Sequence, residues 1–301
     1  LKALPADLIQ CRPVLSVGYA WAFLASGKLA DVETRLRAAE RWLDTGLDTG
    51  LGTGLDTETG AVVVDAEQFR LLPGLIAILR AGHAQVLGDV TNAVKYAQRA
   101  LDLFPAEEQL GRGAAAALLG LAAWTSGDLT TAHRMYADGM ARVQIAGNIS
   151  DVISSAIALA DIRIAQGRLH EAMSTYEQSL QLATAQHREG ARSVLRGTAD
   201  LYVGMSELCR EQNDLPAATQ HLLKSKELGE RTGLPQNWSR WHVAMARIRE
   251  AHGDLAGALD LLHEAERLYV SDFYPNVRPV AALKARVWIA QGRVGEALGW
   301  A

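Results

Sequence analysis

Cysteine is nearly absent from this sequence. Only Cys11 and Cys209 occur among the 301 residues, and they lie far apart in the chain. The disulfide framework of a small secreted protein needs more cysteines at closer spacings. Free cysteine is also one of the most frequently buried residue types. We therefore expect two buried thiols and a reducing, cytoplasmic location.

Long apolar runs and an excess of positive charge are missing as well. The longest apolar stretches, such as residues 114–124, are shorter than the roughly 18 apolar residues that a membrane helix needs. The first ten residues lack the basic head and the cleavage site of a signal peptide. The formal net charge is −4, so the chain lacks the basic surface that phosphate binding requires. We expect no membrane partner, and no contact with DNA through this part of the protein.

The motifs of common catalytic and metal sites are also missing. The sequence contains no Gly-x-x-x-x-Gly-Lys-Ser/Thr phosphate loop, no Gly-x-Ser-x-Gly elbow and no His-Glu-x-x-His zinc helix. His242 and His252 stand ten residues apart, but no further ligand accompanies them at a suitable spacing. The sequence therefore predicts no catalytic residue, no metal and no cofactor in this segment. An enzyme is the least favoured class.

The sequence does contain a repeated turn of the form Gly-Asp-Leu. Four of its six intervals are 39 or 40 residues (127−88, 167−127, 253−213 and 292−253). The seven copies begin at Gly27, Gly88, Gly127, Gly167, Asn213, Gly253 and Gly292. Such a period is typical of solenoids, in which each helix-turn-helix unit buries its apolar face against its neighbours.

Each copy of the turn has the chemistry of a helical hairpin. Glycine, or asparagine at position 213, tolerates the left-handed conformation that ends a helix. In four copies an aspartate follows, where its carboxylate caps the next helix. Five residues after the first turn residue stands alanine, except for Val32 in the first copy, and a small side chain lets two helices approach closely. The four aspartates are Asp89, Asp128, Asp214 and Asp254.

These features predict an all-α fold, a right-handed α-solenoid of about seven tetratricopeptide-like (TPR-like) repeats in one domain over residues 1–301. The helix pairs are expected at residues 12–43, 65–104, 106–147, 149–186, 188–231, 235–271 and 275–301. Residues 44–64 are rich in glycine, aspartate and threonine, which predicts a flexible loop and does not match a calcium loop. The sequence stops early in the last helix, so we expect a segment of a longer protein.

The inner surface of a solenoid is its usual binding surface, and polar residues recur on the first helix of each later pair. Six residues before the turn stand Asp161, Glu207, Arg247 and Arg286, and thirteen before it stand Asp200 and Arg240. Residues seven apart share a helix face. These six residues, called the polar stripe below, are the candidate binding residues for an effector or a partner.

Two interpretations of the polar stripe remain open. It forms either a binding groove or a set of salt bridges between repeats, since Asp200 and Glu207 would lie beside Arg240 and Arg247 of the next repeat. The aromatic residues Trp238, Trp241 and Trp288 likewise suit a ligand wall or simple packing. Charge reversal at the two arginines distinguishes the alternatives, because salt bridges alone would affect stability and not binding.

Several phrases of the sequence resemble a known family. They are the opening Leu4-Pro5 to Leu15, and the runs at residues 157–167 (IALADIRIAQG), 197–208 (GTADLYVGMSEL) and 276–286 (NVRPVAALKAR). They look like the tetratricopeptide-type sensor region of large ATP-binding LuxR-type bacterial regulators related to the maltose regulator. The resemblance covers essentially the whole chain.

The resemblance implies a regulatory function. Members carry an NTPase domain, a winged-helix connector, this superhelix and a C-terminal helix-turn-helix that binds DNA. By analogy the chain would bind an effector molecule or a regulatory protein and control the ATPase and DNA-binding parts of a self-associating transcriptional activator. ATP is implied for the full-length family only. The alternative is a stand-alone TPR-type interaction scaffold.

Overall fold

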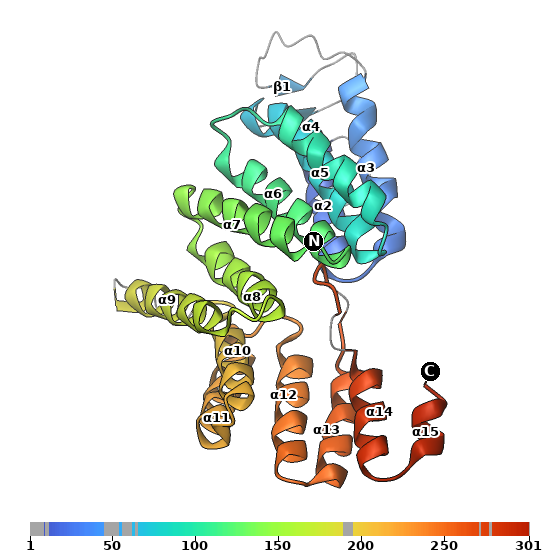
Figure 1. Ribbon diagram of the computed structural model, residues 1–301. Coiled ribbons are helices and arrows are strands. Elements are labelled where there is room, and N and C mark those ends of the chain that lie inside the picture. The colour runs from blue at the N-terminus through green and yellow to red at the C-terminus, as the bar shows by residue number, and fades with distance from the viewer. Residues whose placement is uncertain are drawn as a thin grey trace. The chain divides into compact units, whose positions relative to one another are not determined.

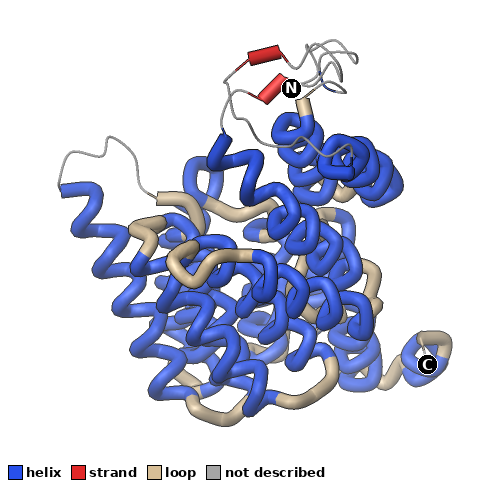
Figure 2. The backbone as a smooth tube through the Cα atoms, turned by 90° about the horizontal axis from the view of Figure 1, so that it is seen from above, coloured by secondary structure: helices blue, strands red, loops and turns tan. Residues whose placement is uncertain are grey.

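Helices account for almost all of the described backbone, as Figure 2 shows. The computed structural model describes residues 9, 12–44, 54–55, 62–63, 66–188, 195–270, 272–276 and 279–300. The chain divides into two compact units, Leu1–Ala146 (unit 1) and Gly147–Ala301 (unit 2). Each unit is described by itself, and the expectation of one domain over the whole chain stays a prediction.

The described residues of unit 1 form three helix pairs, labelled in Figure 1. Their helices are α2 (Pro13–Ala25), α3 (Leu29–Asp44), α4 (Ala66–Val86), α5 (Val90–Leu103), α6 (Gln109–Thr125) and α7 (Leu129–Ile145). Phe104, which follows α5, is buried against Gly74 of α4 and Gly111 of α6, where a methyl group would overlap its ring. This ring therefore joins two consecutive pairs.

Unit 2 contains four further pairs. Their helices are α8 (Ile149–Ala165), α9 (Leu169–Arg188), α10 (Thr198–Glu211), α11 (Leu215–Thr232), α12 (Asn237–Ala251), α13 (Leu255–Arg267), α14 (Val280–Ala290) and α15 (Val294–Leu298). The first helices of successive pairs pack side by side, α8 against α10 and α10 against α12. Ile157, Tyr176 and Leu208 are among the fully buried residues that join α8, α9 and α10. The predicted all-α fold of about seven helical repeats is confirmed, since the described residues form seven helical hairpins.

The turns have the predicted local structure. All seven residues that begin the turns have positive φ, from +61° at Asn213 to +84° at Gly127. All four turn aspartates accept a hydrogen bond from the amide three residues further on, as Asp254 does from Gly257 at 2.9 Å. The small residue five positions after each turn is buried in every repeat, from Val32 to Ala297. The alanine spacing therefore marks the contact between the two helices of a pair.

The predicted boundaries differ from the observed ones at two places. Helix α10 begins at Thr198 rather than at residue 188, because Gly197 before it has a φ of +89°. Helix α14 begins at Val280 rather than at residue 275, because Pro279 before it is extended, with ψ of 133°. Both are backbone constraints that apolar periodicity does not reveal.

Of residues 44–64, most lie outside the described residues. Gly54–Leu55 (β1) and Val62–Val63 (β2) form a short antiparallel pair, in which Gly54 stands opposite Val63. The repeat pattern does not predict this pair. In the described part of the chain, no helix is long and apolar enough to span a membrane.

Candidate functional site

The polar stripe lies on the first helices of the four pairs in unit 2. Asp161 belongs to α8, Asp200 and Glu207 to α10, Arg240 and Arg247 to α12, and Arg286 to α14. The structure brings these residues together in three separate groups. The groups differ in how completely their charges are satisfied.

The first group is a buried ion-pair network between α10 and α12. Nη1 of Arg247 donates to Glu207, and Nη2 of Arg247 donates to Oε1 of Glu211 at 3.2 Å. The side chains of Arg247 and Glu207 are only 11% and 10% exposed. Burial alone would raise the pKa of Glu211, but Arg210 and Arg247 hold it below its ordinary value. This pairing is the one that the salt-bridge interpretation expects, and it holds the two helices together.

The second group joins α14 to α12 in an exposed position. Nε of Arg286 donates to Oε1 of Glu250 at 2.9 Å, and Nη2 donates to Oε2 at 2.5 Å. Arg286 therefore forms a bidentate ion pair, with two parallel hydrogen bonds from one edge of its guanidinium group. The side chain of Arg286 is 52% exposed, so this pair contributes little to stability.

The third group surrounds Arg240, which pairs with Asp161 rather than with Asp200. Nη2 of Arg240 donates to Oδ2 of Asp161 at 3.3 Å, and this is the only hydrogen bond of its guanidinium to a described residue. Both side chains are 26% exposed. Desolvation acts against the charged form, but the carboxylates of Asp161 and Asp200 raise the pKa of Arg240 above its ordinary value. The described residues therefore accept only one hydrogen bond from the charged guanidinium of Arg240.

Asp200 is the buried member of the third group. Its side chain is inaccessible to solvent, and Oδ2 accepts the backbone N–H of Leu234 at 2.9 Å. Burial raises the pKa of Asp200, although Arg240 and the Leu234 amide act in the opposite direction. Asp200 thus fixes the start of the α12 repeat and contributes negative charge beneath Arg240.

Two further residues of the third group, Asp272 and Tyr274, lie between α13 and α14 and do not follow from the repeat pattern of the sequence. Burial raises the pKa of Asp272 to about 6, while Arg240 lowers it and Asp161 raises it further. The hydroxyl of Tyr274 donates to the carbonyl oxygen of Ser154 at 3.4 Å. The sequence signal was the pair Pro275 and Pro279, because proline does not fit inside a helix.

The aromatic residues form one cluster and one separate residue. The ring centroids of Trp238 and Trp241 are 6.2 Å apart. The ring centroid of His242 lies 5.1 Å from that of Trp241. Trp288 packs instead against the core of the last two pairs, and the ammonium group of Lys284 makes a cation–π contact with its ring. The indole N–H of Trp241 donates to the Leu222 carbonyl at 2.8 Å, which places this ring in the core.

The remaining candidates have structural contacts. His242 and His252 each contact a carbonyl one turn earlier in their own helix. Among the described residues, no group of three or more His, Cys, Asp or Glu side chains has the geometry of a metal site. Cys209 is buried, as expected, and burial raises its thiol pKa, whereas Cys11 lies outside the described residues.

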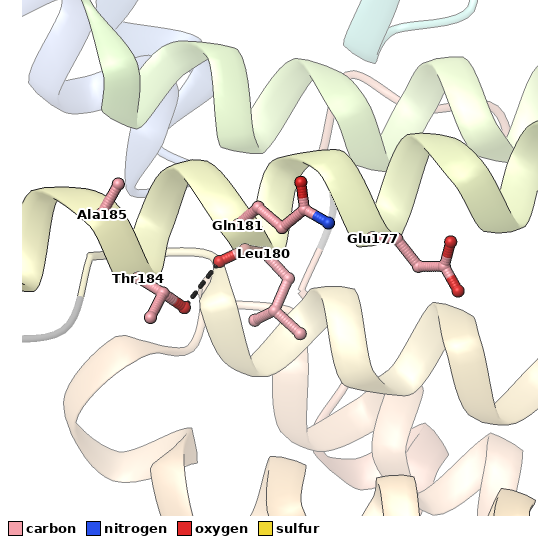
Figure 3. A pocket seen from close by; sticks show the side chains of 5 residues that line it. All are labelled: Glu177, Leu180, Gln181, Thr184 and Ala185. Carbon is pink, nitrogen blue, oxygen red and sulfur yellow. Dashed lines mark hydrogen bonds between the residues drawn. The ribbon is translucent and has the colours of Figure 1, made fainter.

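A shallow groove of about 650 Å³ follows α9, and none of its lining residues belongs to the polar stripe (Figure 3). Its lining residues recur at helical spacing on one face of α9: Glu177, Leu180, Gln181, Thr184 and Ala185. The hydroxyl of Thr184 donates to the Leu180 carbonyl at 2.8 Å and is thereby occupied. This lining offers one carboxylate and no converging set of polar groups.

The family of the chain follows from a match to a sequence-family model. The model describes the MalT-like TPR region and matches residues 74–301, from α4 to the end of the chain. This chain belongs to the MalT-like TPR family. The predicted resemblance is therefore confirmed, and the helical hairpins of this TPR region are its repeats. No curated protein matches the sequence.

Solved structures share the fold at low sequence identity. A Rap protein complexed with competence and sporulation factor has a TM-score of 0.60 at 10% identity, over 96% of this chain and 74% of that one. NprR in complex with its cognate peptide NprX has a TM-score of 0.58 at 12% identity, over 95% and 75%.

A third similar structure is a signal-transduction ATPase with numerous domains that carries a TPR sensor, from Pyrococcus horikoshii. It has a TM-score of 0.59 at 15% identity, over 95% of this chain and 41% of that one. At these identities the likeness shows the fold of this TPR region and not its ligands.

Proposed function

We propose that this MalT-like TPR region is the sensor part of a signal-responsive transcriptional regulator. It binds a peptide or protein effector through the first helices of unit 2, and binding controls the ATPase and DNA-binding parts of a longer protein. The family match supports the regulatory context. The peptide complex of NprR and the TPR sensor of the Pyrococcus ATPase support effector binding by this fold.

The observation that carries the proposal is that the three arginines of the polar stripe differ in how many hydrogen bonds they make to carboxylates. Arg247 and Arg286 each make two side-chain hydrogen bonds to glutamates, so they hold helices together. Arg240 makes one hydrogen bond of 3.3 Å and remains partly exposed beside Asp161. We assign recognition to Asp161 and Arg240, positioned by Asp200, and a structural role to Glu207, Arg247 and Arg286.

A thermal-shift screen with sugars, nucleotides, metabolites, peptides and protein fractions tests the proposal. A ligand that binds only the folded state raises the melting temperature by mass action. We expect a shift with a peptide or protein and its loss in Arg240→Gln, but not in Arg286→Gln. A shift with a small molecule alone would assign the effector to that class instead. Hits that persist in Arg240→Gln would refute the assignment of recognition to this group.

The alternative function is a stand-alone interaction scaffold. The two functions differ in what binding does, so the full-length protein has to be assayed for ATP hydrolysis with and without the captured partner. A sensor predicts that the partner changes the hydrolysis rate. A partner that binds without changing hydrolysis or DNA binding favours the scaffold.

A further inference from the structure

The connection between α13 and α14 folds back onto unit 2. It joins Arg267 to Val280, and its described part, residues 272–276, is called the strap. Tyr269 and Val270 before the strap are 48% and 37% exposed, whereas the strap residues 272–275 are all half-buried. In Figure 1 this connection is the orange-to-red segment between the two helices. The strap is therefore packed against other elements.

Two polar side chains attach the strap to the first helices. The Tyr274 hydroxyl reaches the Ser154 carbonyl of α8, 120 residues earlier in the chain. The Asp272 carboxyl lies near Arg240 of α12 and Asp161 of α8, since both affect its pKa. Oδ1 of Asp272 also accepts the Tyr274 backbone N–H at 2.8 Å, which fixes the two side chains relative to each other. The strap thus spans from α12 to α8 beside the least satisfied part of the polar stripe.

We propose that the strap occupies a peptide-binding site of unit 2 and that this site takes an extended peptide with a carboxylate followed two residues later by a tyrosine. The inference rests on the proposed function and specifies its ligand. The strap is then an internal competitor that an incoming peptide displaces.

The charges of the site favour the replacement of the Asp272 carboxylate by a carboxylate of the ligand. A ligand carboxylate that replaces Asp272 leaves the charge beside Arg240 and Asp161 unchanged, whereas an added carboxylate would join the three aspartates that already surround Arg240. Arg240 has donors available for such a group, because its guanidinium makes one hydrogen bond to a described residue. The Ser154 carbonyl accepts a tyrosine hydroxyl equally from the strap or from a ligand.

Near neutral pH, the ionised Asp272 carboxyl contributes less to holding the strap in place than its neutral form does at lower pH. Burial raises the pKa of Asp272 to about 6, so at pH 7.5 the carboxyl is ionised in a place that favours its neutral form. The charged groups that face it are Arg240 from α12, which opposes this shift, and Asp161 from α8, which adds to it, with Asp200 of α10 beneath Arg240. Because the docked form binds the proton more tightly, docking strengthens as the pH falls below about 6 and weakens as it rises.

A peptide with the sequence of the strap tests the proposal directly. The probe is acetyl-Asp-Phe-Tyr-Pro-Asn-amide, titrated by calorimetry into the full chain and into Tyr274→Ala. We expect about tenfold or tighter binding to Tyr274→Ala, because a site that is free in only one molecule in ten has a tenfold lower apparent affinity. Equal affinity for both proteins, or no binding to the folded variant at millimolar peptide, would overturn the proposal.

Peptide variants test the position of each group without altering the protein. A peptide with the same residues in scrambled order should not bind. The aspartate peptide should bind Tyr274→Ala, in which the strap no longer competes, about tenfold more tightly at pH 5 than at pH 7.5, as follows for a carboxyl whose pKa moves from about 4 to about 6. A peptide with asparagine in its place should show no such dependence. The same pH profile for both peptides would contradict the placement of the ligand carboxylate at the Asp272 position.

Three controls keep the outcome interpretable. Arg240→Gln should abolish peptide binding, while Arg286→Gln on the same stripe should not. If Tyr274→Ala does not fold, amide exchange of Tyr274 in the wild-type chain replaces it, and exchange unaffected by saturating peptide then counts against displacement. If the strap peptide binds but no cellular peptide or protein partner is found, the proposed function is refuted and the strap proposal is not. If a partner binds the wild type and Tyr274→Ala with equal affinity, the strap proposal is refuted and the proposed function is not.

Discussion

Tyr176 and Gly204 fix the contact between two consecutive repeats of the TPR region. Tyr176 of α9 is fully buried, and its hydroxyl donates to Asp161 at 3.4 Å. Its ring lies directly against Gly204 of α10, where a methyl group would overlap it. The absence of a side chain at position 204 therefore lets a core tyrosine also support one of the recognition residues.

Gly204→Ala is expected to destabilise unit 2. Overpacking a tight core contact costs about 1 to 3 kcal/mol, even after the gain in helix propensity from alanine. Chemical unfolding of the two proteins measures the difference. Gly18→Ala in α2 is the matched control, because nothing lies near its added methyl group and the change should be neutral or stabilising. Equal effects at both sites would contradict this packing.

The two arginines of the stripe with structural roles should differ in their effect on stability. Arg247→Gln leaves the buried Glu207 without its main cation, and breaking a buried pair costs about 3 kcal/mol. Arg286→Gln breaks an exposed pair and should cost less than about 1 kcal/mol. Urea titrations of both variants provide the comparison. A similar cost for both would show that the α10–α12 network is not the stronger contact.

At the scale of the helix, turn chemistry determines where the second helix of a pair starts. Asp254 caps α13 through the Gly257 amide, whereas Arg293 at the matching position of α15 makes no such bond. Asp254→Ala should therefore destabilise the chain by about 1 kcal/mol, and Asp254→Asn should retain most of the cap. Thermal unfolding compares the two variants. An equal loss in both would attribute the effect to charge rather than to capping.

The helices were predictable because their signals are local. The residues with positive φ, the aspartates of four turns and the small residue five positions further on act within one hairpin, so a single sequence reveals them. The start of α10 after Gly197 was not predictable, since apolar spacing continues through a backbone constraint. The pairing of Arg240 with Asp161, 79 residues away, was also missed, because it depends on how three repeats stack. Tyr274 of the strap had no periodic signal at all.

At the scale of the whole molecule, the two units should respond differently to a local change. Stability in repeat proteins is approximately a sum of repeat terms and nearest-neighbour contacts. Gly204→Ala should therefore speed amide exchange most in α8 to α11 and progressively less in more distant repeats. Exchange mass spectrometry of both proteins measures this gradient. A uniform increase over all helices would indicate one cooperative unit instead.

Exchange of the charges of Asp161 and Arg240 tests the central claim most directly. The double variant Asp161→Arg with Arg240→Asp keeps opposite charges on α8 and α12 but places a carboxylate near Asp200 and Asp272, so circular dichroism must first show that it is folded. The measurement is the affinity of this variant for the captured peptide or protein, beside a Glu250→Arg, Arg286→Glu exchange as control. The account predicts that binding is lost in the first variant and retained in the second. Unchanged binding by a folded Asp161–Arg240 exchange variant would contradict it.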